Sequence, residues 1–403
     1  MAVERPYDLV LFGATGFTGA LTAEYLARSA PPECRWALAG RNRAKLAALR
    51  ERLVAVNPAC AELPLLDADA TAAASLREIA GRTRVVISTV GPYLRYGEPL
   101  VAACADAGTD YVDLTGEPEF VDRMYLLHHR RAVETGARLV HTCGFDSVPH
   151  DLGVLFTVRQ LPVDGPVAVR GYVRAGGTFS GGTFASALTA FSRPLAAARA
   201  AKARRAAEPG PAGRRVSTAA GRPRRSAEAR AWAVPLPTID AQVIGRSAAA
   251  LAEYGPDFHY GHYAAVKRLP VALAGVAGIT LLALAAQLPP LRRALSALRK
   301  PGEGPSEEQR AASWFTVRFV GEAAGERVFT EVSGGDPGYT ETAKILAESA
   351  LCLAFDELPA TAGQVTTAAA MGTALLDRLI SAGLRFAVLD APPTTPPGRV
   401  RPA

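Results

Sequence analysis

The sequence contains, close to its start, the stretch Tyr7-Asp8-Leu9-Val10-Leu11-Phe12-Gly13-Ala14-Thr15-Gly16-Phe17-Thr18-Gly19. Its apolar run ends in three glycines spaced Gly-x-x-Gly-x-x-Gly, and apolar residues at helical spacing follow over residues 21–26. Glycine lets the backbone turn sharply and come close to a ligand. The pattern therefore predicts a strand, a tight turn and a helix.

A turn of this kind predicts a dinucleotide site in the first βα unit of a doubly wound sheet. Backbone N–H groups and the positive end of the helix dipole would face the pyrophosphate. The alternative is a glycine-rich turn without a ligand, but the strand before it and the helix after it favour the site. The residues that we expect to bind the cofactor here are Gly13, Thr15, Gly16, Phe17, Thr18 and Gly19.

The second strand indicates which nucleotide binds. A strand over residues 35–39 is followed by Gly40-Arg41-Asn42-Arg43, with no carboxylate at the place where an NAD site would hold the ribose 2′-OH. The planar guanidinium of Arg41 suits a 2′-phosphate instead, although a solvated surface arginine is the simpler alternative. We therefore predict NADP(H), with Asp67, at the end of a short strand over 63–66, near the adenine.

The same pattern continues to about residue 150. Further strands are predicted over 85–88, 111–114 and 138–141, each followed by a loop rich in glycine, proline and polar residues. Ligands of open α/β sheets bind at this end of the strands, so Thr89, Gly91 and Pro92 are expected to contact the cofactor. The fold class is α/β, a Rossmann-like doubly wound parallel sheet with a second mixed α/β domain.

Residues 1–150 are assigned to the NADP-binding domain, residues 151–390 to the second domain and 391–403 to a proline-rich tail. In the second domain the sequence predicts a strand over 167–173, a hairpin of 314–320 with 327–332, and a helix over 340–355. A glycine-rich turn over 176–183 is expected to lead into a helix whose N–H groups could face a substrate, or to be a plain loop.

Cysteine usage and charge bear on the class of protein. The five cysteines are scattered without Cys-x-x-Cys spacing, which argues against a disulfide framework and against a zinc site and favours a reducing, cytoplasmic compartment. No metal is expected, and the first strand begins too close to Met1 for a signal peptide. Eleven Lys and Arg residues against two Glu mark a basic insertion over about 193–230. One interpretation is that this insertion is attracted to an anionic membrane or to an acidic carrier protein. The alternative is a mobile, solvated insertion. Binding to nucleic acid is disfavoured, because no aromatic residues are interleaved with the basic ones.

A second unusual segment covers about residues 269–290. It is apolar and uncharged, it is flanked by Lys267, Arg268, Arg292 and Arg293, and no acidic residue occurs between Asp257 and Glu303. Its length is at the limit for crossing a bilayer. Three alternatives are a spanning helix, a helix lying in the membrane surface and a buried helix of the second domain; we prefer peripheral attachment at the inner face of the plasma membrane.

Several separated motifs resemble the saccharopine-dehydrogenase-like oxidoreductases and, within them, the actinobacterial trans-acting enoyl reductases. The resemblance implies an NADP-binding Rossmann-like domain, a second α/β domain and a role in lipid or glycolipid biosynthesis, with a carrier-bound acyl substrate and a polyketide synthase as partner. It covers nearly the whole chain. The motifs are Gly13 to Gly19, Gly91-Pro92-Tyr93, Asp113-Leu114-Thr115-Gly116-Glu117, Gly144-Phe145-Asp146-Ser147-Val148-Pro149-His150, and Gly334-Gly335-Asp336-Pro337-Gly338-Tyr339.

Enoyl reduction requires a donor for the developing enolate oxygen and a source of the proton. Tyr93, on the loop after the fourth strand, is the first candidate, with an aromatic wall residue as the alternative. Asp146 and His150, after the sixth strand, could orient the substrate or donate, although a helix cap and a structural histidine are equally compatible with the sequence. The other functions left open are a dehydrogenase acting on a carbonyl or imine and a non-catalytic NADP-binding scaffold or sensor.

Overall fold

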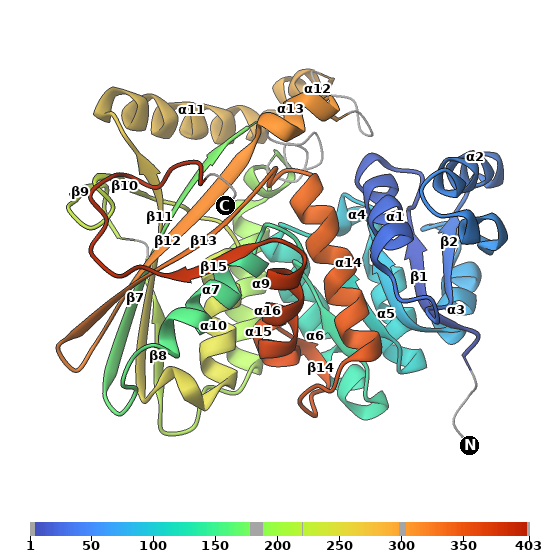
Figure 1. Ribbon diagram of the computed structural model, residues 1–403, viewed down its shortest axis with the longest axis horizontal. Helices are drawn as coiled ribbons and strands as arrows, with labels where there is room; N and C mark the ends of the chain where they lie inside the picture. Colours follow the sequence, from blue (N-terminus) through green and yellow to red (C-terminus); the bar gives the residue numbers. More distant parts are fainter. Residues whose placement is uncertain (1–4, 178–187, 220, 298–303, 401–403) are drawn as a thin grey trace.

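The computed structural model describes residues 5–177, 188–219, 221–297 and 304–400, so most of the turn predicted over 176–183 lies outside the described residues. Two sheets stand side by side, and a layer of helices that includes α7, α10, α14 and α16 lies between them (Figure 1). The amino-terminal sheet and its helices form the blue and cyan half of the picture.

The first sheet is parallel throughout and has seven strands in the order β14-β6-β5-β4-β1-β2-β3. From β3 to β6 this is the 3-2-1-4-5-6 order of a dinucleotide-binding fold, which confirms the predicted class. The strands are β1 (Tyr7–Phe12), β2 (Trp36–Gly40), β3 (Leu65–Asp67), β4 (Thr83–Ser88), β5 (Asp110–Asp113), β6 (Arg138–Val140) and β14 (Gly363–Val365).

Helices cover both faces of this sheet because its strands alternate between two cores. Leu9 and Leu11 of β1 pack with α1 (Phe17–Ser29), α2 (Arg43–Val54) and α14 (Thr340–Phe355), whereas Val10 and Phe12 pack on the other side. That second core holds α3 (Ala73–Gly81), α5 (Glu98–Ala107) and α6 (Pro118–Thr135). Near-continuous apolar strands are what a sheet buried on both faces requires.

The carboxyl-terminal part of the chain returns to this first sheet. Strand β14 extends it beyond β6, and α14 packs on β1, β4 and β5 and on α1. Both elements lie in the range that the sequence assigns to the second domain. The helix predicted over 340–355 is confirmed with these bounds.

The second sheet is mixed and has eight strands, in the order β15-β13-β12-β7-β11-β10-β9 with β8 paired to β11. The predicted hairpin is confirmed: β12 and β13 are antiparallel and turn at Ala324 and Gly325, whose φ values are +50° and +82°. The strands are β7 (Pro166–Gly176), β8 (Arg215–Thr218), β9 (Arg224–Ser226), β10 (Ala231–Pro235), β11 (Asp257–Val266), β12 (Trp314–Ala323), β13 (Glu326–Gly334) and β15 (Arg385–Val388).

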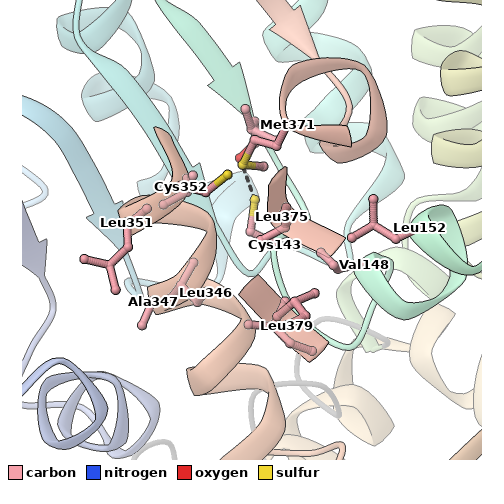
Figure 2. Packing of buried hydrophobic residues seen from close by; sticks show 14 of the residues in the cluster. Cys143, Val148, Leu152, Leu346, Ala347, Leu351, Cys352, Met371, Leu375 and Leu379 are labelled. Carbon is pink, nitrogen blue, oxygen red and sulfur yellow. Dashed lines mark hydrogen bonds between the residues drawn. The ribbon is translucent and has the colours of Figure 1, made fainter. Parts of the chain in front are cut away.

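Helices α7 (Val148–Val158) and α10 (Asp240–Ala250) pack on this sheet, α7 against β7, β12 and β13 and α10 against β8 and β11. One apolar cluster then continues from the first sheet to the second. Figure 2 shows its centre, where Cys143 and Leu152 meet Leu346 of α14 and Leu379 of α16 (Gly372–Ser381). All five cysteines are buried and free.

The basic insertion is folded, so the alternative of a mobile segment is wrong for its described part. Helix α9 (Pro194–Ala207) packs along α6, with Arg193 paired to Glu119 at 2.8 Å and Arg204 to Asp122 at 2.7 Å. These pairs place a positive charge beside two buried acids of α6. The remaining elements are α4 (Tyr93–Tyr96), α11 (Leu269–Gln287), α12 (Pro289–Ala297), α13 (Glu307–Ala312), α15 (Thr367–Ala370), η1 (Pro58–Glu62) and η2 (Ala252–Tyr254).

Candidate functional site

The glycine turn between β1 and α1 has the geometry of a pyrophosphate cradle. Gly13 has a φ of +86°, and a Cβ on it would lie 2.7 Å from Thr89 Oγ1. A Cβ on Gly19 would lie 2.3 Å from the carbonyl oxygen of Gly13, so the turn and the helix can approach only as glycines. Gly16 is exposed, and the nearest atom to a Cβ there is 3.4 Å away, which leaves its surface open to a ligand.

Helix α1 begins with unsatisfied amides beside this opening. Its first intrahelical bond is donated by Ala20 N to Gly16 O at 2.8 Å, and the N-cap Gly16 has no side chain to accept from the amides of Phe17, Thr18 and Gly19. Thr15 is exposed at the tip of the turn. Thr89 Oγ1 donates towards the Gly13 oxygen at 3.1 Å and so ties the end of β4 to the turn. These residues fit a diphosphate held by main-chain N–H groups.

Arg41 follows β2 directly, is exposed, and makes no hydrogen bond or ion pair within the described part of the chain. Its neighbour Arg43 is already engaged, with the Leu65 oxygen at 3.2 Å and Asp67 at 3.4 Å. Asn42 caps α2 by accepting from Lys45 N. Arg41 is therefore the guanidinium available to a 2′-phosphate. Asp67 is exposed at the end of β3 and lies opposite Gly40, the residue before Arg41.

The loop after β4 does not present a free phenol. Tyr93 is 6% exposed, its hydroxyl donates to the Ser88 oxygen at 3.0 Å, and it accepts from Leu114 N at 3.2 Å. Burial raises the pKa of this phenol well above its usual value. The Tyr93 side chain thus joins the end of β4 to the end of β5, and its hydroxyl is already engaged in hydrogen bonds to both strands. Gly91 is exposed, and Pro92 follows a cis peptide bond.

The loops after β5 and β6 are fastened to each other by Asp113. Its Oδ1 accepts from Thr115 N at 3.0 Å and Thr142 N at 3.1 Å, and its Oδ2 lies 2.7 Å from His141 Nδ1. Asp146, on the second of these loops, lies against the first, since a Cβ on Gly116 would be 3.4 Å from its Oδ2. Asp146 is half-buried, and no described group forms a hydrogen bond or ion pair with its carboxyl.

Desolvation, together with the nearby Asp240 carboxylate, raises the pKa of Asp146 to about 7. This carboxyl therefore carries a proton for much of the time near neutral pH. A carboxylic acid in that state, at the carboxyl end of the parallel sheet, can donate a proton to a substrate.

His150 lies behind this loop, in the first turn of α7, where it meets two residues that the sequence analysis missed. Asp240 begins α10 and His262 lies in β11; the carboxylate is 3.7 Å from His150 Nε2 and 3.5 Å from His262 Nε2. Each of the three is at most 4% exposed. They come from three distant segments, so no local spacing could have found the cluster.

The second domain also covers the glycine turn. The Phe17 ring packs edge-on against Tyr339 with centroids 4.7 Å apart, and the guanidinium of Arg310 lies 5.6 Å from the same ring. Two surface cavities lie elsewhere, one lined by Arg5, Asp110 and Arg138 and the other by Tyr25, Glu348 and Arg378. Neither contains a residue of the predicted site.

Comparison with known proteins agrees with this geometry. Residues 9–140 match the model of the saccharopine dehydrogenase NADP-binding domain. A Mycobacterium ulcerans protein named trans-acting enoyl reductase is 36% identical, over 95% of this chain and 98% of its own. A Mycobacterium tuberculosis protein provisionally given the same name is 40% identical, over 95% of this chain and 97% of its own. The chain belongs to the trans-acting enoyl reductase family.

Membership makes the chain an NADP-dependent oxidoreductase with a saccharopine-dehydrogenase-type nucleotide domain, and the predicted cofactor NADP(H) is confirmed. Apo saccharopine dehydrogenase (L-Glu forming) from Saccharomyces cerevisiae has the same fold, with a TM-score of 0.55 over 95% of this chain and all of that one. At 11% identity that likeness concerns the fold alone.

Proposed function

We propose that this reductase saturates the α,β double bond of a lipid- or polyketide-type acyl chain held on a carrier protein, as a separate polypeptide acting in trans. The single observation that carries the proposal is the relationship to trans-acting enoyl reductases along 95% of the chain, which includes both sheets. When bound, NADPH supplies the hydride that reaches the β-carbon.

The chain's own residues would complete the reaction at the α-carbon. Asp146 is the proposed proton donor, because its carboxyl has no hydrogen-bond or ion-pair partner among the described residues, has a pKa of about 7, and lies on the loop after β6 against the loop after β5. The amides of α1 and the guanidinium of Arg41 would hold the nucleotide. Asp113 would fix the loops after β5 and β6, which would lie beside the double bond of the substrate.

The test is NADPH oxidation by the purified full chain with two kinds of substrate. An enoyl thioester on a carrier protein should be reduced, whereas a keto acid with an amine should not. Turnover only with the keto acid and amine would indicate a dehydrogenase of carbonyl or imine substrates. Tight NADPH binding without turnover on any of them would indicate a non-catalytic sensor or scaffold.

We further propose that the enzyme attaches peripherally to an anionic membrane through α11. This helix has a mean hydropathy of 2.2, is the one helix of the described chain long and apolar enough to cross a bilayer, and is only 11% buried. Only Ala272 and Ala286 are buried, so the alternative of a buried domain helix is wrong. Figure 1 shows α11 lying across the outer end of the second sheet.

Attachment along the surface is favoured over crossing. Strands β11 and β12, which flank the segment, both pair with β7, and the end of β11 and the start of β12 meet the same end of that strand. A single crossing would place those two ends on opposite sides of the bilayer. Lys267 and Arg268 before the helix and Arg292 and Arg293 after it would face anionic headgroups.

A further inference from the structure

The buried cluster of His150, Asp240 and His262 is the feature of the molecule that the reaction proposed above leaves unexplained. It draws on three elements: α7 and α10, which pack against each other, and β11 of the second sheet, against which α10 packs. One ligand atom from each residue can be chosen so that all three lie within 4.8 Å of one another.

The separations within the cluster do not suit hydrogen bonds. The Asp240 carboxylate is 3.7 Å and 3.5 Å from the two imidazole Nε2 atoms, whereas N–H···O bonds span about 2.7–3.2 Å. Asp240 Oδ1 is buried and, within the described part of the chain, has no hydrogen-bond partner. A buried carboxylate oxygen with no partner is costly, so the arrangement calls for a positive group that is shared by all three side chains.

We propose that His150 Nε2, the Asp240 carboxylate and His262 Nε2 form a binding site for a divalent transition-metal ion of the Zn²⁺ class. Two atoms that each lie about 2.0–2.2 Å from a tetrahedral ion are about 3.3–3.6 Å apart. The two carboxylate–imidazole separations, 3.7 Å and 3.5 Å, match this value to within a small movement. Two imidazoles with one carboxylate form a ligand set that such ions accept.

The surroundings of the cluster support the assignment. His262 Nδ1 lies 2.9 Å from the buried hydroxyl of Tyr260, which orients the ring so that Nε2 faces Asp240, as the outer partners of metal-bound histidines do. Both rings are buried away from solvent, and a neutral imidazole keeps a lone pair for a metal.

Three protein ligands leave a fourth position open, as in catalytic rather than structural zinc sites. The ring of Phe145, next to Asp146, lies 5.4 Å from that of His150, so the ion would sit directly behind the proposed active-site loop. A role there in holding the thioester oxygen rests on the proposed function. The binding of the ion itself does not rest on the proposed function, and Asp146 is not among the ligands of the ion.

The test measures metal binding alone. The full chain, purified without a histidine tag and depleted of metal with a chelator, is titrated with Zn²⁺ by calorimetry and with Co²⁺ by visible absorption. We expect one ion per chain and a Co²⁺ spectrum of low coordination number. Asp240→Asn and His262→Gln should each weaken binding by about 100-fold or more. His259→Ala is the matched control, because His259 is exposed on the same strand.

Undiminished NADPH binding by each variant shows that it is folded. The proposal is overturned if the folded wild-type chain binds neither ion, or if Asp240→Asn and His262→Gln bind the ion as tightly as the wild type. Zn²⁺ binding without enoyl reduction would leave the metal site standing and reject only the proposed reaction.

Discussion

Arg41 makes a prediction about nucleotide choice. Its guanidinium is exposed at the end of β2, and charge-assisted hydrogen bonds to a phosphate contribute about 1.5–3 kcal/mol. Arg41→Ala should therefore weaken NADPH binding about 10- to 100-fold and NADH binding hardly at all, as measured by calorimetry. Arg52→Ala is the control, because Arg52 lies near the far end of α2, the helix that follows Arg41, and pairs with Glu24. Equal losses for both nucleotides would show that Arg41 does not read the 2′-phosphate.

Asp146 and Tyr93 give opposite predictions, although the sequence offered both as catalytic candidates. Asp146→Asn should lower kcat about 10²- to 10⁴-fold and leave NADPH affinity unchanged, because only the proton donor is lost. Tyr93→Phe removes a buried hydrogen bond to the Ser88 oxygen. It should lower the free energy of unfolding by about 1–2 kcal/mol with little change in kcat. Steady-state kinetics with chemical denaturation of both variants separates the two roles, and a fully active Asp146→Asn variant would remove the proposed donor.

The limits of sequence reasoning are clear at these residues. Position after a strand was enough to predict that Asp146 and Gly91 lie at the carboxyl end of the sheet. It could not predict that the phenol of Tyr93 turns inward, since that depends on hydrogen bonds to two neighbouring strands. Asp240 and His262 join His150 only through tertiary packing, and a single sequence carries no signal for such a meeting.

Helix α11 carries the prediction about membranes. Leu273, Leu281 and Leu284 are 57–67% exposed, so changing all three to Gln should alter the free energy of unfolding by little. The variant should lose at least about 10-fold in partitioning to vesicles containing phosphatidylglycerol, because burying each leucine in lipid contributes up to about 1.5–3 kcal/mol. Flotation on sucrose gradients measures this.

Two comparisons make the membrane test specific. Leu195→Gln, which changes an exposed leucine on α9, should float like the wild type. If the basic residues that flank α11 contribute to binding, the wild type should bind more weakly to vesicles of phosphatidylcholine alone, and more weakly to anionic vesicles at high salt. Wild-type protein that stays wholly unbound from anionic vesicles at low salt would reject the attachment.

Elements were predicted better than their partners. The strands of the first sheet, the hairpin of the second and the helix over 340–355 follow from apolar periodicity and turn residues, which are local signals. Local signals do not predict that α14 covers the first sheet or that the three-residue β14 extends it. Both arrangements are decided by packing between distant segments of the chain. Choosing between the alternatives for α11 likewise required the solvent exposure of its side chains, which apolar periodicity does not predict.

At the level of the entire chain, the two sheets share one apolar core, and elements of the carboxyl-terminal half reach back to cover the nucleotide turn. The proposed sites therefore draw on both halves: the proposed nucleotide site uses main-chain amides and Arg41 of the first, and the proposed metal site uses Asp240 and His262 of the second. We accordingly expect that the amino-terminal half alone does not reproduce the reductase.

The most direct test of the account follows a label from the cofactor to the product. NADPH carrying deuterium at the transferable position of the nicotinamide is incubated with the full chain and an enoyl group on a carrier protein, and the released acyl chain is analysed by mass spectrometry. The account predicts a saturated chain with one deuterium at the β-carbon and a solvent proton at the α-carbon. An unchanged double bond, with the nucleotide bound but not consumed, would contradict it.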